Sequence, residues 1–198
     1  MPTDIVTNTR PYDSSKPPFL AAAFDGGGAR GLYSCSVLAT VAQRFAGPGS
    51  TGIEYDVGAR FNLIAGVSTG AILAAALAMG FSPDHLVRLY RERGQRIFPS
   101  PVPRGQIAMM AFAARHFSRA FNPIAPLREA LVELFGSETF DSMHQARKIA
   151  LCIPTVDVST HRAWVYKTGH LPLKTRDNGT TLVDACLASS AALGVSTL

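Results

Sequence analysis

Residues 61–79, FNLIAGVSTGAILAAALAM, decide the fold. The stretch joins a strand-length apolar run to a helix-length run rich in Ala and Leu, which are good helix formers. Between them, Ser68 is flanked by Gly66 and Gly70. This setting is typical of a nucleophile elbow, which places the Ser at the positive end of the helix. The alternative is a plain Gly-x-Ser-x-Gly turn without chemistry.

A second strand, turn and helix precede the elbow. An apolar strand is predicted at 19–24, buried on both faces, and a helix at about 32–45. Between them lies Asp25-Gly26-Gly27-Gly28-Ala29-Arg30-Gly31. Bare backbone N–H groups at a helix N-terminus form an anion site. The anion is either a phosphate or the oxyanion of a tetrahedral acyl-transfer intermediate.

The phosphate alternative rests on Gly26-x-Gly28-x-x-Gly31, which formally matches the dinucleotide fingerprint. That fingerprint calls for an acidic residue at the end of the next strand. Glu54 and Asp56 instead precede the strand at 61–65. No Lys-Ser/Thr pair follows the glycines, which excludes a P-loop. A nucleotide-binding module is therefore the weaker alternative.

The length of 198 residues and the composition indicate one globular domain, at 19–198, behind a loose leader at 1–18. No apolar run reaches the roughly 18 residues that a membrane span needs, and no signal peptide is evident. Cys35, Cys152 and Cys186 are widely spaced in apolar surroundings, without metal-ligand spacing. We expect reduced thiols in the core and a cytoplasmic location.

Positive charge is concentrated between His85 and Arg128, where eight arginines face Glu92 alone. Such a patch suits phosphate on a lipid headgroup or a nucleic acid. Of the two we favour peripheral contact with an anionic membrane surface, with no nucleic-acid partner. A solvated face that aids solubility is the alternative.

The rest of the chain predicts further helices and one strand pair. A helix is expected from Pro83 to Arg93, stopping at Gly94, and another through Phe135. Between them, 106–121 reads as a buried helix or an amphipathic cover that touches lipid. A hairpin is expected from strands at 148–158 and 163–166, and a helix rich in small residues at 181–192.

These motifs, in this order and spacing, resemble the patatin-like phospholipase family. The blocks that agree lie at 25–31, 63–70, 157–158 with 165–167, and 188–192, so that the likeness spans about residues 19–192. The resemblance implies an α/β fold, three-layer α/β/α with a mostly parallel central sheet. It also implies a patatin-like serine acyl hydrolase that cleaves fatty acyl esters of phospholipids or neutral lipids.

The resemblance also assigns roles to individual residues. Ser68 is the nucleophile of a Ser–Asp dyad without His, and no metal or organic cofactor is required. The N–H groups of Gly26, Gly27 and Gly28 form the oxyanion hole. Arg30 orients that loop or adds positive charge beside it. The two motifs are completed by Asp25, Gly31, Gly66 and Gly70.

One part of the family pattern is missing. In the family the general base is an Asp in an Asp-Gly-Gly or Asp-Gly-Ala motif after the late helix. No such motif occurs between Ala192 and Leu198, and Leu193 replaces the usual Pro. We therefore expect the domain at 19–198 to be C-terminally incomplete and the dyad Asp to lie beyond Leu198. A Ser without a base is a poor nucleophile. The 198-residue chain alone is then inactive, or the protein is a catalytically inactive patatin-like binding protein.

Other bases within the chain are less favoured. Asp177 lies in an Asp-Asn-Gly sequence, but precedes the late helix instead of following it. A hydrolase triad in the order Ser, acid, His would use Asp141 or Asp157 with His161 or His170. Each His is more simply a loop or strand-end residue.

Overall fold

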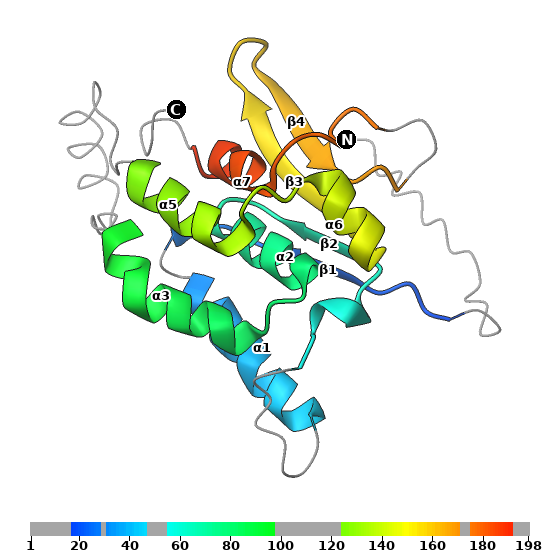
Figure 1. Cartoon of the computed structure of the whole chain (residues 1–198), viewed down its shortest axis with the longest axis vertical. Helices are drawn as coiled ribbons and strands as arrows, with labels where there is room; N and C mark the ends of the chain where they lie inside the picture. Colours follow the sequence, from blue (N-terminus) through cyan, green and yellow to red (C-terminus); the bar gives the residue numbers. More distant parts are fainter. Residues whose placement is uncertain (1–16, 29–30, 47–54, 98–123, 171–174, 192–198) are drawn as a thin grey trace, which may run out of the picture.

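The computed structural model describes residues 17–28, 31–46, 55–97, 124–170 and 175–191. Its centre is a four-stranded sheet in the order β1-β2-β3-β4 (Figure 1). β2 pairs in parallel with both β1 and β3, and β4 returns antiparallel to β3. The predicted α/β class with a mostly parallel sheet is confirmed. The strands are β1 (Ala21–Phe24), β2 (Leu63–Gly66), β3 (Ala150–Asp157) and β4 (Arg162–Lys167).

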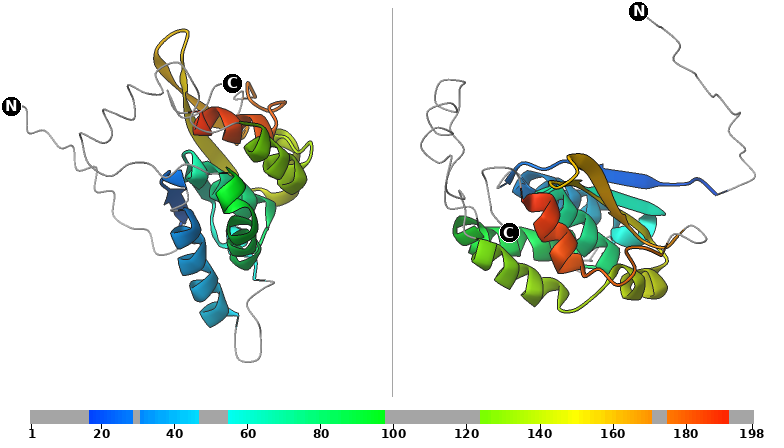
Figure 2. Two further views of the ribbon diagram at one scale, coloured as in Figure 1. Left: turned by 90° about the vertical axis from the view of Figure 1, so that its left-hand side faces the viewer. Right: turned by 90° about the horizontal axis from the view of Figure 1, so that it is seen from above.

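Six α-helices accompany the sheet in the described residues, together with a short 3-10 helix at Gly58–Arg60. Both predicted strand–turn–helix units are present, as is the predicted hairpin. The hairpin of β3 and β4 extends beyond the other strands (Figure 2). The helices are α1 (Gly31–Phe45), α2 (Thr69–Met79), α3 (Pro83–Ile97), α5 (Ile124–Phe135), α6 (Phe140–Arg147) and α7 (Leu182–Ser190).

Helix α2 forms the middle of the core. Every residue from Thr69 to Ala78 is buried, because α2 packs on β1, β2 and β3 and is covered by other helices. Such all-round apolarity is what a fully enclosed helix requires. Its end at Gly80 is as predicted: this glycine has φ 93°, in the left-handed region, and its N–H caps the last turn. The elbow is therefore anchored on a buried helix.

The two faces of the sheet differ. Ile64, Leu151 and Ile153 are fully buried beneath the helices. Side chains on the opposite face are exposed, among them Ala23 and Val156. In β1, exposed and half-buried residues alternate. The prediction that this strand is buried on both faces is therefore wrong, because β1 lies at the edge of the sheet with helices against one face.

Two helix predictions need correction. Helix α3 continues through Gly94 to Ile97, since one glycine in a helix costs only about 1 kcal/mol. Helix α6 was not predicted. It begins at a capping box, in which Thr139 and Ser142 exchange side-chain to backbone hydrogen bonds. The leader up to residue 16 and the expected element at 106–121 lie outside the described residues.

Candidate active site

The Ser68 turn has the backbone geometry of a tight elbow. Ser68 lies between β2 and α2 with φ 55° and ψ −124°, a conformation that residues other than glycine rarely adopt. Both flanking glycines are required by space. A Cβ added to Gly66 would lie 2.1 Å from the carbonyl oxygen of Gly70, and one on Gly70 would lie 2.1 Å from that of Phe24. The tight turn predicted from the sequence is thus present.

The fold brings the glycine loop against this elbow. The N–H of Val67 donates a 3.1 Å hydrogen bond to the carbonyl of Phe24, which joins the ends of β1 and β2. The next turn of chain places Gly26 beside Ser68. A Cβ added to Gly26 would lie 2.9 Å from the Ser68 Cβ and 3.6 Å from its Oγ. Two motifs that are about 40 residues apart in the sequence therefore form one site.

The remaining residues of the glycine motif take several positions. Gly27 and Gly28 have φ 150° and 58°, a region that favours glycine. Asp25 is exposed at the end of β1, and Gly31 begins α1. Arg30 lies outside the described residues, so its predicted role stays a prediction.

Polar side chains are buried beneath the start of α1. A Cβ added to Gly31 would lie 2.8 Å from the hydroxyl of Tyr90 and 3.3 Å from the Cβ of Thr69. The hydroxyls of Tyr90 and Thr69 are buried and have no hydrogen-bond partner among the residues that the structure describes. Burial raises the pKa of Tyr90 and raises that of the Cys35 thiol to about 12. The Tyr90 hydroxyl and the Cys35 thiol below the glycine loop are therefore protonated and uncharged at neutral pH.

All three cysteines are free, as predicted, but only two of them lie in the predicted core. Cys35, Cys152 and Cys186 are all free; Cys35 and Cys186 are buried and Cys152 is partly exposed. Burial also raises the pKa of Cys152 and Cys186.

The acids considered as alternative bases have other partners. Asp157 accepts hydrogen bonds from the N–H and the hydroxyl of Ser159 and from the hydroxyl of Thr160, inside the β3–β4 turn. These bonds lower the pKa of Asp157. Asp141 accepts a 3.1 Å hydrogen bond from the side-chain amide of Asn178. Asp157 therefore acts within the hairpin turn, whereas Asp141 joins the first turn of α6 to the loop before α7.

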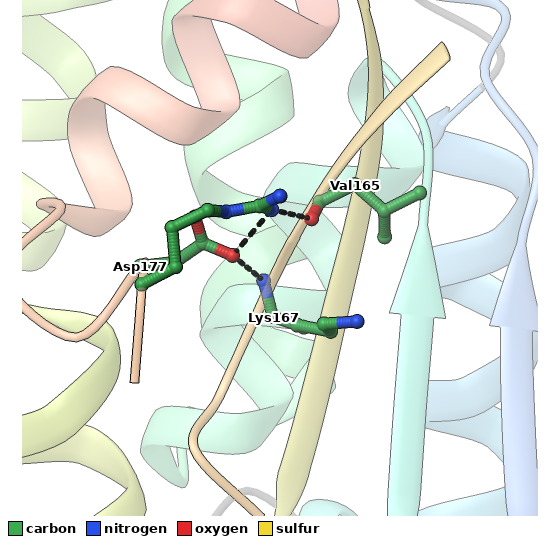
Figure 3. A network of polar contacts seen from close by, with 4 residues as sticks. Val165, Lys167 and Asp177 are labelled. Carbon is green, nitrogen blue, oxygen red and sulfur yellow. Dashed lines mark hydrogen bonds and ion pairs between the residues drawn. The ribbon is translucent and has the colours of Figure 1, made fainter. Parts of the chain in front are cut away.

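Asp177 and Arg176 together form hydrogen bonds to the backbone of β4. The buried carboxylate of Asp177 accepts hydrogen bonds from the Lys167 N–H at 3.1 Å and from the Arg176 guanidinium at 2.7 and 2.8 Å. The guanidinium also donates to the Val165 carbonyl (Figure 3). It stacks on Trp164, 3.8 Å from the ring centroid. Such a fully bonded carboxylate fixes the loop before α7 and is a poor general base.

The two histidines considered for a triad lie beyond opposite ends of β4. His170 follows β4 and contacts the Thr168 hydroxyl through Nδ1 at 2.8 Å. Because β4 runs antiparallel to β3, His170 lies toward the end of the sheet where β2 begins. Ser68 lies at the other end, where β2 ends. His161 lies in the hairpin turn with φ 52°. Within the described ranges, no acid or histidine hydrogen-bonds to the Ser68 hydroxyl.

Sequence reasoning missed one residue that contacts the elbow. The hydroxyl of Ser189, near the end of α7, accepts a 2.9 Å hydrogen bond from the N–H of Ser68. The two residues are 121 positions apart. No local pattern signals such a contact; the only hint was that Ser189 belongs to the small-residue helix that resembles a family block.

The match to a known family agrees with this geometry. The model of the patatin-like phospholipase family matches residues 22–196, and the chain belongs to that family. Curated relatives include two proteins named cGAMP-activated phospholipase. The one from Vibrio cholerae is 35% identical over 191 residues, which are 93% of this chain and 51% of the relative. The one from Escherichia coli is 34% identical over 178 residues, 89% of this chain and 47% of the relative.

The chain thus spans about half the length of these curated relatives. Among solved structures, VipD from Legionella pneumophila is 14% identical with a TM-score of 0.48, covering 88% of this chain and 42% of VipD. The ExoU–SpcU complex from Pseudomonas aeruginosa gives 16% identity and a TM-score of 0.46, covering 88% and 36%. Within the described residues, every helix is too short or too polar to cross a membrane.

Proposed function

We propose that this chain carries the nucleophile and the oxyanion hole of a serine-dependent lipid acyl hydrolase. Its substrates would be fatty acyl esters of phospholipids or lysophospholipids. The contact between Gly26 and Ser68 is the observation that carries the proposal, because a glycine-loop backbone beside an elbow serine is what ester cleavage requires. The relatives named as phospholipases support the lipid substrate.

The reaction would proceed through an acyl-enzyme. The Ser68 Oγ attacks the ester carbonyl carbon, and its proton passes to the base. Negative charge develops on the carbonyl oxygen, where the N–H groups of Gly26, Gly27 and Gly28, which precede α1, would stabilise it. Arg30 is predicted to orient this loop or to add positive charge. The lysolipid alcohol then leaves with a proton. Water hydrolyses the acyl-Ser68 ester, releases the fatty acid and restores the hydroxyl.

The base of the dyad stays a prediction. We expect it in an Asp-Gly motif beyond Leu198 in the complete protein. Asp141, Asp157 and Asp177 each accept hydrogen bonds from other residues of the chain, which supports a base from another part of the protein. If no such Asp exists, the protein is a binding member of the family.

Peripheral contact with anionic membranes is part of the proposal. Arg88 and Arg91 are exposed on α3, whereas Arg104, Arg115 and Arg119 lie outside the described residues. R88Q/R91Q is expected to weaken binding to phosphatidylglycerol vesicles, and R44Q/R162Q, which removes the same charge at two exposed positions outside the patch, to weaken it less. Equal binding by both double variants would remove α3 from the proposal. A cytoplasmic location stays a prediction from the free thiols.

Hydrolysis of phospholipid vesicles by the complete protein tests the function. cGAMP is added in one arm, because the relatives are named as activated by it. Ser68→Ala is expected to reduce turnover by at least about 10³-fold, and Ser36→Ala, a serine in α1 that hydrogen-bonds within its own helix, to leave it unchanged. Turnover retained in Ser68→Ala would overturn the assignment of the nucleophile.

A further inference from the structure

Ser189 joins three parts of the fold at the nucleophile. Its hydroxyl accepts the 2.9 Å hydrogen bond from the Ser68 N–H and donates a 2.7 Å hydrogen bond to the Pro154 carbonyl. Ser189 lies on α7, Pro154 on β3 and Ser68 at the elbow. One hydroxyl therefore links the late helix, the central sheet and the reacting residue.

The direction of each of the two hydrogen bonds of Ser189 follows from the chemistry of its partners. A hydroxyl has one proton and two acceptor lone pairs. Because the backbone carbonyl of Pro154 can only accept, the Ser189 proton points to it and leaves a lone pair toward the Ser68 N–H. Alanine at 189 would lose both bonds, whereas threonine would retain the hydroxyl.

A second hydrogen bond holds the same turn of α7 against β3. The hydroxyl of Thr155 donates to the Ala188 carbonyl at 2.9 Å. This bond ties α7 to the strand without touching Ser68. It offers a matched comparison, since its loss loosens the same two elements and leaves the elbow amide bonded.

The elbow needs such support. Ser68 has φ 55° and ψ −124°, a strained conformation for a residue with a side chain, which persists only when the surroundings impose it. A hydrogen bond to the amide nitrogen of Ser68 restrains the φ rotation that would release this strain. It also occupies the Ser68 N–H and leaves stabilisation of the oxyanion to other amides.

We propose that Ser189 is a positioning residue that holds the Ser68 elbow in its reactive conformation from helix α7. Its effect on turnover rests on the proposed function, whereas its effect on the backbone does not. Removal of the Ser189 hydroxyl would let the amide of Ser68 open and the Oγ leave the attack geometry. It would not alter Arg88 and Arg91 on α3, which are proposed to contact the membrane.

The test compares Ser189→Ala, Ser189→Thr and Thr155→Val in the complete protein. Hydrogen exchange of the Ser68 amide, resolved by NMR or by fragmentation mass spectrometry, is expected to be about tenfold faster in Ser189→Ala, as for the loss of one hydrogen bond. Ser189→Thr should restore protection. Thr155→Val should leave the Ser68 amide protected, although the melting temperature of this variant should fall, as that of Ser189→Ala does.

Kinetics provide a second readout. Ser189→Ala is expected to lower kcat for ester cleavage about 10²-fold with KM unchanged, because the error lies in alignment and not in binding. Equal exchange of the Ser68 amide in Ser189→Ala and Thr155→Val would overturn the role of Ser189. If wild-type protein hydrolyses no ester, the proposed function fails, and the exchange experiment still decides on Ser189.

Discussion

Gly26 lies so close to Ser68 that a methyl group cannot fit between them: its added Cβ would be 2.9 Å from the Ser68 Cβ. The same Cβ would be 3.1 Å from the Val67 carbonyl oxygen, which is backbone and cannot rotate away. The glycine loop and the elbow therefore lie in close contact. An atom added between them would displace one of the two.

Gly26→Ala is accordingly expected to lower kcat about 10²-fold, because a shift of about 1 Å at the reacting atoms is enough for that loss. The free energy of unfolding should fall by about 1–3 kcal/mol from overpacking. The control is Gly179→Ala, an exposed position where an added Cβ meets nothing within 4 Å. Full activity in Gly26→Ala would mean that the loop is not at the reacting centre.

Strain at Ser68 predicts an unusual stability order. Ser68→Gly and Ser68→Ala both remove the hydroxyl, but only glycine is at ease with φ 55°. We expect Ser68→Gly to be more stable than Ser68→Ala by about 1 kcal/mol or more in chemical denaturation, with both inactive. If Ser68→Ala proves the more stable variant, the elbow is not strained.

Arg147 should contribute to the anchoring of α2. Its Nε donates a 3.1 Å hydrogen bond to the Ala78 carbonyl in the last turn of α2, and its guanidinium pairs with Asp56. Charge and donor both suit a helix C-terminus. Arg147→Met is expected to cost about 1–2 kcal/mol, discounted because the pair is only partly buried.

Arg128→Met is the matched control for this effect. Arg128 forms an ion pair with Asp184 at 3.4 Å, and both side chains are more than half exposed. Its loss should change stability by less than about 0.5 kcal/mol. Equal losses in the two variants would show that the contact of Arg147 with α2 is not stabilising.

Burial predicts an order of thiol reactivity. The thiolate is the form that reacts, and burial raises the Cys35 pKa to about 12, so that at pH 8 this group stays protonated in the folded protein. Iodoacetamide is expected to modify the partly exposed Cys152 first, and Cys35 and Cys186 only on unfolding. Peptide mapping over time measures this order; early modification of Cys35 would contradict the packing of α1.

The raised Cys35 pKa also predicts a loss of stability in alkali. An unfolded thiol titrates near pH 9, whereas the folded one does so near 12. The folded state therefore binds the extra proton between these values, and stability should fall as pH rises through this window. Cys35→Ala should reduce that fall.

Much of the fold was predictable because its signals are local. The elbow follows from Gly66, Ser68 and Gly70 between an apolar strand and an apolar helix, and Gly80 marks the helix end. Helix α6 was missed because its capping box uses Ser142, where the usual signal has Glu or Gln. Edge position, which decides the burial of β1, is a property of the sheet and not of residues 19–24.

The site was predictable only in part, for a similar reason. Glycine spacing identified Gly26 and Ser68, but their contact depends on the pairing of β1 with β2. The hydrogen bond from Ser68 to Ser189 joins residues 121 positions apart and leaves no trace in local pattern. The stacking of Arg176 on Trp164 also depends on the folded structure and not on a local pattern. The hydrogen bonds that Arg176 donates to Asp177 explain why Asp177 is a structural acid.

Covalent labelling tests the central claim most directly. The complete protein is incubated with a fluorophosphonate probe, which reacts with activated serines, and the modified peptide is identified by mass spectrometry. We predict one major adduct on Ser68, lost in Ser68→Ala and slowed in Gly26→Ala. No adduct on Ser68, or an adduct on another serine that tracks with ester hydrolysis, would contradict the account.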